Sequence, residues 1–411
     1  MLTIEPARRR HAGTGKLGIA LAGGGPLGAF YELGALHALS ESIVGRSLTD
    51  FDVYVGVSSG SLLAAGLANG FDTTTIGTSL IRGESTRVPF SPGLLLTPAL
   101  GEYASRLVRL PAMLAEGVRQ YARDPLRMGW AAIASSFTKI LPAAAFDTAP
   151  IERYLRRVFG ANGHTDDFRE LAARLYVVAT DLDTGESVDF GAPGHDEVRI
   201  SRAVVASAAL PGLYPAVEID GRHFVDGALI RTMHASLALE AGCELVICIN
   251  PLVPFDAARG IRRRRLVQEG LDTILGQTFR ALIHSRMQVG MASYGARFPR
   301  ADTLLFEPDR HDETLFFTNV FRYSGRRRLA EHAYQQTRRD LLAHSTALGR
   351  LLRPHGLQLD LDRLRARRRT FAAAGRERTA HARRMTTDLR GALTRLERLL
   401  EPPEGRASRR S

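Results

Sequence analysis

The five residues Gly56-Val57-Ser58-Ser59-Gly60 form the first pattern in the sequence that could perform chemistry. They follow a short apolar run, 53–56, that predicts a strand, and they precede small residues, 61–69, that predict a helix. A sharp turn from strand to helix needs glycine on either side of its serine and exposes the hydroxyl at the edge of the sheet. The helix would direct the positive end of its dipole at charge formed there. The pattern predicts a nucleophile, Ser58, with an ordinary glycine-rich turn as the structural alternative.

A glycine-rich loop, Gly23-Gly24-Gly25-Pro26-Leu27-Gly28, lies one strand earlier, between the apolar run 17–21 and a helix that we expect over 27–39. Its spacing matches a dinucleotide-binding fingerprint, which requires an acidic residue about 20 positions later, at the end of the next strand. That strand instead ends at Ser58, which weakens the nucleotide interpretation. The same backbone can form an oxyanion hole, in which the amides of Gly24 and Gly25 would donate to a tetrahedral intermediate.

A third motif, Asp226-Gly227-Ala228, ends an apolar strand expected at 223–227. Its carboxylate could accept the Ser58 proton directly, without an imidazole, although Asp-Gly is also an ordinary turn. A conventional triad would need a histidine in a loop after the acid. His234 and His284 do not sit in that context, and we expect surface or helix-capping roles for both.

The only two cysteines, Cys243 and Cys248, lie within one apolar segment. Five positions apart on a strand, they would point to opposite faces and could not form a disulfide. We expect both to be buried small hydrophobic residues. No metal-ligand spacing is present, so the sequence predicts neither a metal nor a cofactor.

Together, the three motifs in this order resemble the patatin-like phospholipase family, and the resemblance runs from Leu17 to Asn250. It implies a Ser–Asp dyad that cleaves carboxylic esters of phospholipids or acylglycerols through an acyl-serine intermediate. Ala206-Ser207-Ala208-Ala209-Leu210-Pro211-Gly212 resembles the segment that packs beneath the site in that family. The implied roles are Ser58 as nucleophile, Asp226 as base, Gly23, Gly24, Gly25 and Gly28 as oxyanion hole, and Gly56, Gly60 and Gly227 as supports of the motifs.

One departure from the family pattern is Leu27, where members usually carry Arg or Lys. A basic side chain there would fix the loop or add positive potential, so its absence bears on rate or substrate choice. It also keeps open a second interpretation, a catalytically weak patatin-like protein that binds lipid or acts as a scaffold.

Strands and helices alternate through the region that must position these motifs, with further strands expected at 175–180, 187–190 and 245–249 and helices at 202–209 and 234–241. The alternation predicts an α/β fold with a mainly parallel central sheet sandwiched by helices. Residues 82–145, which include Trp130, predict a helical insertion that forms either a lid or ordinary core helices.

We expect four regions along the chain. A basic N-terminal leader (1–16) precedes the catalytic domain (17–250). An α-rich extension (251–352), with one strand at 303–306, packs on that domain, and a basic amphipathic helical tail (353–411) follows.

The net charge of +12 is concentrated in the tail, where sixteen Arg face seven acidic residues. Such a surface suits an anionic membrane, whereas nucleic-acid binding is disfavoured because the tail lacks interleaved aromatic residues. A hydrophobic fraction of 45% and a charged fraction of 24% argue against disordered and membrane-spanning classes. No apolar run approaches the roughly 20 residues of a transmembrane helix, and no signal-peptide pattern is present. We therefore expect a cytoplasmic protein that contacts the membrane peripherally.

Overall fold

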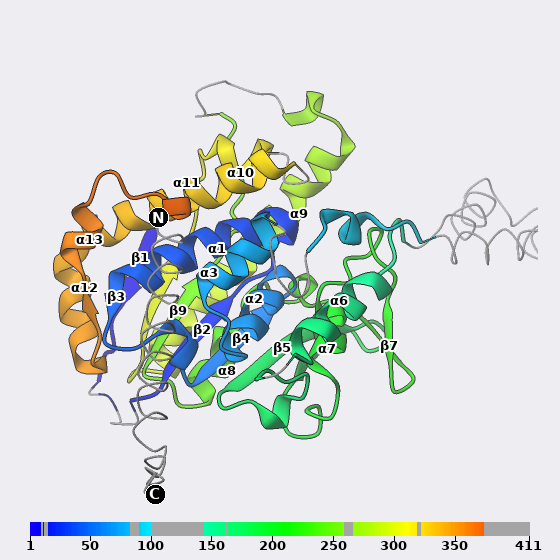
Figure 1. Cartoon of the computed structure of the whole chain (residues 1–411), viewed down its shortest axis with the longest axis horizontal. Helices are drawn as coiled ribbons and strands as arrows, with labels where there is room; N and C mark the ends of the chain where they lie inside the picture. Colours follow the sequence, from blue (N-terminus) through cyan, green and yellow to red (C-terminus); the bar gives the residue numbers. More distant parts are fainter. Residues whose placement is uncertain are drawn as a thin grey trace, which may run out of the picture.

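The structure, a computed structural model, describes residues 1–9, 11, 15–82, 90–99, 144–161, 163–258, 266–318 and 322–373. Within these ranges one nine-stranded sheet has the order β1-β10-β9-β2-β4-β5-β8-β7, and β6 pairs with β5 (Figure 1). Its strands are β1 (Leu2–Glu5), β2 (Leu17–Leu21), β4 (Val53–Val57), β5 (Arg174–Asp181), β6 (Ser187–Phe190), β7 (Val217–Ile219), β8 (Arg222–Asp226), β9 (Leu245–Ile249) and β10 (Asp302–Phe306). Two short strands, β3 (Ile43–Val44) and β11 (Gln358–Leu359), pair separately.

The centre of the sheet is parallel, because β10, β9, β2, β4 and β5 pair with one another in that sense. The outer strands β1, β6, β7 and β8 pair antiparallel. Every residue of β2, β4, β9 and β10 is buried, as expected for parallel strands covered on both faces. The predicted α/β fold with a mainly parallel sheet between helices is confirmed.

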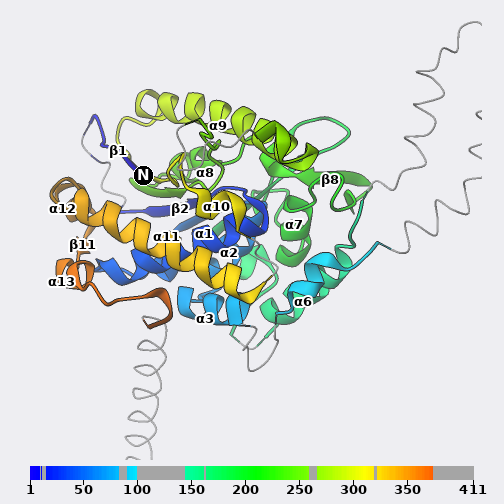
Figure 2. The same ribbon diagram turned by 90° about the horizontal axis from the view of Figure 1, so that it is seen from above.

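Helices form a layer on each face of this sheet (Figure 2). Apolar side chains of α1, α2, α7 and α11 join one core cluster, and those of α8 and α9 join a second. Alternate residues of the strands feed the two clusters, since Ile19 and Leu21 lie in the first and Ala20 in the second. The helices are α1 (Gly25–Ser42), α2 (Ser59–Ala68), α3 (Thr73–Gly77), α6 (Ala149–Phe159), α7 (Ile200–Ser207), α8 (Ala235–Glu240), α9 (Leu271–Arg297), α10 (Glu313–Phe317), α11 (Tyr323–Ala343), α12 (Ser345–Leu352) and α13 (Leu361–Arg365).

Strands β4 and β8 meet end to end along one edge of β5. β6 pairs with residues 177–180 of β5, β4 pairs with 174–178 and β8 with 179–181. Some β5 residues pair with both β4 and β6, and others pair with both β8 and β6. Since a residue can pair with only one strand on each side, β4 and β8 both lie on the edge of β5 opposite β6. Val57 therefore faces Val178, and Asp226 faces the next residue, Ala179.

Segments near both ends of the described part of the chain also join the core. β1 adds an edge strand that the sequence analysis did not predict, and β10, the strand expected at 303–306, belongs to the main sheet. In the region predicted as tail, Leu357, Leu364 and Phe371 are buried. The arginine Arg369 there pairs with Glu41 of α1 at 2.7 Å. The division into four regions stays a prediction.

Most of the predicted insertion 82–145, Trp130 included, and the amphipathic helix predicted for the end of the tail lie outside the described residues. None of the helices in the described ranges is both long and apolar enough to cross a bilayer.

Both cysteines are buried and free, as predicted. The expectation that they point to opposite faces is wrong, because Cys243 precedes β9 and its side chain joins the same core cluster as Cys248.

Candidate active site

Ser58 occupies a strained turn between β4 and α2. Its φ of 51° and ψ of −123° lie in a region that residues other than glycine rarely adopt. This is the backbone of a strand-to-helix elbow, which lifts the hydroxyl away from the strand and places it before the first turn of α2. Ser58 is the residue that precedes α2, so the unpaired amides at that helix end face the turn.

The hydroxyl of Ser58 donates to the carboxylate of Asp226, with 2.6 Å between Oγ and Oδ2. The two residues are 168 positions apart in the sequence and meet because β4 and β8 end against each other on β5. The other oxygen of Asp226, Oδ1, accepts the amide of Ala228 at 2.9 Å. Ser58 and Asp226 are 5% and 3% exposed, so this pair lies in a nearly dry site.

Ser207 at the end of α7 holds the elbow from beneath. Its Oγ accepts the Ser58 amide at 2.8 Å and donates to the carbonyl of Val178 at 2.5 Å. Ser207 thereby links the turn to β5, the strand that sets the register of the site. Ser207 lies in the segment 206–212 that resembles the family, but its own role was not predicted; a hydroxyl among small apolar residues was the available signal.

The glycines that flank Ser58 and Asp226 stand where backbones come very close. A Cβ on Gly60 would lie 2.6 Å from the carbonyl oxygens of Leu21 and Ala22. One on Gly56 would collide with the backbone of Ser61, and one on Gly227 with the carbonyl of Val178.

The glycine-rich loop lies against the elbow, since a Cβ on Gly23 would be 3.1 Å from that of Ser58. The Gly23 amide donates to the carbonyl of Thr232 at 3.1 Å, and the Gly28 amide donates to Gly24 at 2.9 Å. Among the described residues, no hydrogen bond is formed by the amides of Gly24 and Gly25. Within the described structure these two amides are therefore available as donors, whereas the amides of Gly23 and Gly28 are already bonded.

The pKa of Asp226 is raised to about 6. Burial disfavours its charge, and the hydrogen bonds from Ser58 and Ala228 offset only part of that effect. A carboxyl group with this pKa is mostly ionised at neutral pH and remains able to take up a proton.

Among the described residues, no histidine forms a hydrogen bond with Ser58 or Asp226. His234 and His284 are 4% and 6% exposed, so the predicted surface roles are wrong. His234 stands at the start of α8 but its side chain makes no capping hydrogen bond. Burial lowers its pKa to about 4, which keeps it neutral. In the described structure neither ring bonds to Ser58 or Asp226.

Leu27, the departure from the family pattern, is half-buried on α1 and packs against the larger core cluster. The position is thus filled by apolar packing.

Comparison with known proteins gives one family. A family model described as patatin-like phospholipase matches residues 19–239, just over half of the chain. The match spans the glycine-rich loop, the elbow and Asp226.

Several solved structures are also similar. VipD from Legionella pneumophila is 15% identical with a TM-score of 0.36, and the alignment covers 84% of this chain and 70% of VipD. The type III effector ExoU of Pseudomonas aeruginosa is 17% identical, with a TM-score of 0.30 and coverage of 94% and 64%. Human GIVD cytosolic phospholipase A2 is 13% identical, with a TM-score of 0.34 and coverage of 83% and 59%. The chain thus spans less than two thirds of the last two proteins, and at these TM-scores the likenesses add nothing to the family match.

Proposed function

This chain belongs to the patatin-like phospholipase family, and we propose that it is a lipid acyl hydrolase whose Ser58 and Asp226 form the catalytic dyad. The observation that carries the proposal is the 2.6 Å hydrogen bond from Ser58 Oγ to Asp226 Oδ2 inside a strained strand-to-helix turn. The substrates are carboxylic esters of phospholipids or acylglycerols.

In the first half of the reaction, Asp226 accepts the hydroxyl proton while Ser58 Oγ bonds to the ester carbonyl carbon. The amides of Gly24 and Gly25 stabilise the oxyanion, and each such donor is typically worth about 3 kcal/mol in the transition state. The intermediate collapses to acyl-Ser58 when the ester C–O bond breaks. The proton held by Asp226 passes to the leaving alcohol.

In the second half, Asp226 takes a proton from water as the water attacks the acyl-serine carbonyl. The fatty acid leaves, and the proton returns to Ser58 Oγ. One carboxylate can serve both halves because its pKa of about 6 lies close to neutral pH, where a group is efficient both as base and as acid.

Covalent labelling with a fluorophosphonate separates this function from the lipid-binding or scaffolding alternative. An activated Ser58 reacts with the probe, and Ser58→Ala removes both the label and at least ~10⁴-fold of ester hydrolysis. Ser47→Ala is the matched serine control and should retain both, because Ser47 precedes β4 whereas Ser58 follows the other end of that strand. Absence of label on the folded wild-type protein would favour the scaffold. Comparing the lipids released by wild type and Ser58→Ala identifies the substrate.

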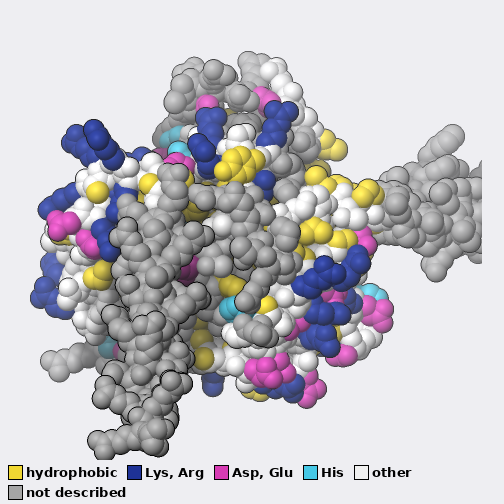
Figure 3. All heavy atoms as spheres, viewed as in Figure 1, with side chains coloured by type: hydrophobic (Ala, Val, Ile, Leu, Met, Phe, Trp, Pro, Cys, Tyr) yellow, Lys and Arg dark blue, Asp and Glu magenta, His cyan; other side chains and the backbone are white. Residues whose placement is uncertain are grey.

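Peripheral membrane contact is supported by the exposed apolar face of α9. Five large side chains along that face are 47–72% exposed: Leu271, Leu275, Phe279, Leu282 and Val289. On the side of the molecule drawn in Figure 3, basic side chains gather in clusters with apolar side chains exposed between them. Apolar groups beside positive charge favour the surface of an anionic bilayer.

Charged substitutions on α9 test this contact. Phe279→Asp with Leu282→Asp should weaken sedimentation with anionic vesicles at least ~10-fold, because two exposed apolar side chains that would enter the bilayer are lost and two negative charges are added. Leu342→Asp on α11 is the matched control. Equal binding by both variants would exclude α9 as the contact.

The basic end of the chain contributes separately. Deleting residues 374–411 removes Arg-rich sequence but leaves the packed segment up to 373 in place. Vesicle binding should weaken at low salt, whereas hydrolysis of a short soluble ester should be unchanged. If both are unchanged, this part of the chain has no role at the membrane.

A further inference from the structure

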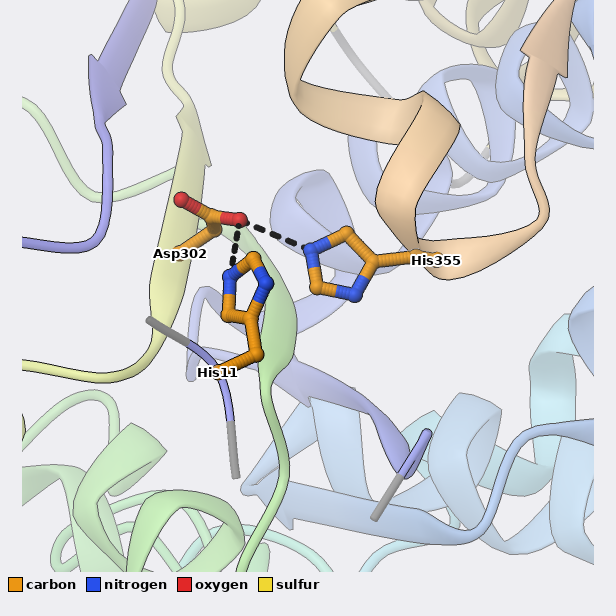
Figure 4. Close-up of side chains that lie close together, drawn as sticks. All are labelled: His11, Asp302 and His355. Atoms are coloured by element: carbon orange, nitrogen blue, oxygen red, sulfur yellow. Dashed lines mark hydrogen bonds and ion pairs between the residues drawn. The ribbon is translucent and has the colours of Figure 1, made fainter. Parts of the chain in front are cut away.

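Three side chains from distant parts of the sequence converge at one point: His11, Asp302 and His355 (Figure 4). The Nε2 atoms of His11 and His355 lie 2.9 Å and 2.7 Å from the same oxygen, Oδ2 of Asp302. The three atoms lie within 4.8 Å of one another. Two imidazole nitrogens and one carboxylate oxygen therefore face a common centre.

This cluster is far from the proposed catalytic dyad along the sheet. Asp302 is the first residue of β10 and is level with Leu245 and Leu17, which begin the parallel strands β9 and β2. Ser58 follows the last residue of β4, at the opposite end of the same parallel set. The cluster must be explained without reference to ester hydrolysis.

We propose that His11, Asp302 and His355 bind a divalent transition-metal ion of the zinc class. Imidazole and carboxylate are ligands that Zn²⁺ accepts at roughly 2.0–2.2 Å, and tetrahedral coordination would place the ligand atoms about 3.3 Å apart. The two histidine nitrogens are now 2.7–2.9 Å from Oδ2, so an ion entering between them needs to part the side chains by about half an ångström.

The surroundings of Asp302 suit a metal ligand. Its second oxygen, Oδ1, accepts the amide of Ala7 at 2.6 Å, which fixes the carboxylate and leaves Oδ2 facing the histidines. Its own amide donates to the carbonyl of Glu244 at 2.8 Å. Such outer hydrogen bonds orient the ligands of natural metal sites.

The three proposed ligands differ in how far their side chains are exposed to solvent. The side chains of Asp302 and His355 are 6% and 1% exposed, while that of His11 is 23% exposed. The site is thus closed on the side of the sheet and reachable from the side of His11. Three protein ligands leave a fourth position for water.

The expected role of the ion is structural. His11 follows β1, and His355 lies in the short 3-10 helix Arg353–His355 after α12. Both segments would be tied to the start of β10. An ion bound only by the folded chain adds its binding free energy to stability.

Metal titration of the full-length protein tests the site. After removal of metal with a chelator, one Zn²⁺ per chain should bind by calorimetry and raise the unfolding midpoint by ~2 °C or more, whereas Mg²⁺ should not. His11→Gln and Asp302→Asn should each weaken Zn²⁺ binding at least ~10-fold. His332→Gln is the control and should leave Zn²⁺ binding unchanged, since His332 pairs at 2.7 Å with Asp312, outside the cluster.

Two results would overturn the proposal. The wild type could bind less than one Zn²⁺ per chain, which would mean that the three side chains only form hydrogen bonds with one another. Alternatively, His11→Gln could bind Zn²⁺ as tightly as the wild type and the His332→Gln control, which would place the metal elsewhere. Should Asp302→Asn fail to fold, His11→Gln still decides, because His11 is the most exposed of the three ligands.

Discussion

Asp226 and Asp302 are both buried at an end of a strand of the same sheet, yet their surroundings shift their pKa values in opposite directions. Burial raises the pKa of Asp226 to about 6, against a hydroxyl and one amide as donors. Burial also acts to raise the pKa of Asp302, but hydrogen bonds from His355 and Ala7, with the nearby His11, outweigh it and hold the pKa below its usual range.

The difference separates the proposed catalytic base, Asp226, from the proposed metal ligand, Asp302. Asp226 is left with few partners and gains basicity, which is useful for proton transfer and costs stability. Asp302 is satisfied on both oxygens and anchors three chain segments. Replacing each by asparagine keeps the shape and removes the charge, and therefore exposes the contrast.

The largest expected effect is on catalysis. Asp226→Asn should lower kcat/KM for a soluble ester by about 10²–10⁴-fold, the usual contribution of a positioned base. Asp52→Asn is a matched control that should retain activity, because Asp52 precedes β4 and lies at the opposite end of that strand from Ser58. Near-normal turnover by Asp226→Asn in steady-state assays would remove Asp226 from the mechanism.

The next effect is the pH profile. Since the reaction needs ionised Asp226 and its pKa is about 6, log kcat/KM should be flat above pH 7 and fall below pH 6, reaching a loss of about tenfold at pH 5. Circular dichroism over the same range checks that the protein stays folded. A profile that is flat down to pH 5 would contradict the assigned base.

Stability should move in opposite directions for the two aspartates. Because the folded pKa of Asp226 lies above the unfolded value of about 3.9, its charge destabilises the fold above pH 6, and this penalty fades between pH 6 and pH 4. Asp226→Asn should therefore raise the free energy of unfolding at pH 8, by up to about 3 kcal/mol, and add little at pH 4.

Asp302→Asn should instead lower the free energy of unfolding by about 1–3 kcal/mol, because it removes the charged acceptor of buried hydrogen bonds. Urea unfolding of both variants at pH 8 measures the contrast. If both substitutions changed the free energy of unfolding in the same direction, the proposed contrast between Asp226 and Asp302 would be wrong.

The smallest expected effect concerns the frame of the dyad. Ser207→Ala leaves the Ser58 amide and the Val178 carbonyl without their shared partner. We expect a loss of about tenfold in kcat, with KM little changed, because the turn that holds Ser58 relaxes while the groups proposed to react stay in place. The comparison with Asp226→Asn, measured under the same conditions, separates positioning from proton transfer.

The sequence was informative where a local pattern determines structure. Glycines at both sides of Ser58, with a strand before and a helix after, are enough to predict the elbow, and the alternation of apolar strands and helices predicts the parallel sheet. These features depend on neighbours in the chain, so they can be read from spacing alone.

Features that depend on long-range contacts were missed. Nothing near Leu2–Glu5 indicates that it pairs with β10, and nothing near His11 points to Asp302, because those partners are some 300 positions away. The arginines after residue 353 indicated a basic amphipathic tail, yet Arg369 pairs with Glu41 of α1, which only the fold could reveal. The histidines His234 and His284 were misjudged for the same reason.

Because β4 and β8 meet end to end on β5, the spacing of residues along β5 determines how far Ser58 lies from Asp226. Val178 and Ala179 contribute no reactive group, yet their adjacency sets the separation of Ser58 from Asp226. One residue inserted between them would shift the two halves by about 3.3 Å and turn one half to the other face of the sheet. An enzyme with every reactive residue intact could thus be silenced by a change in length alone.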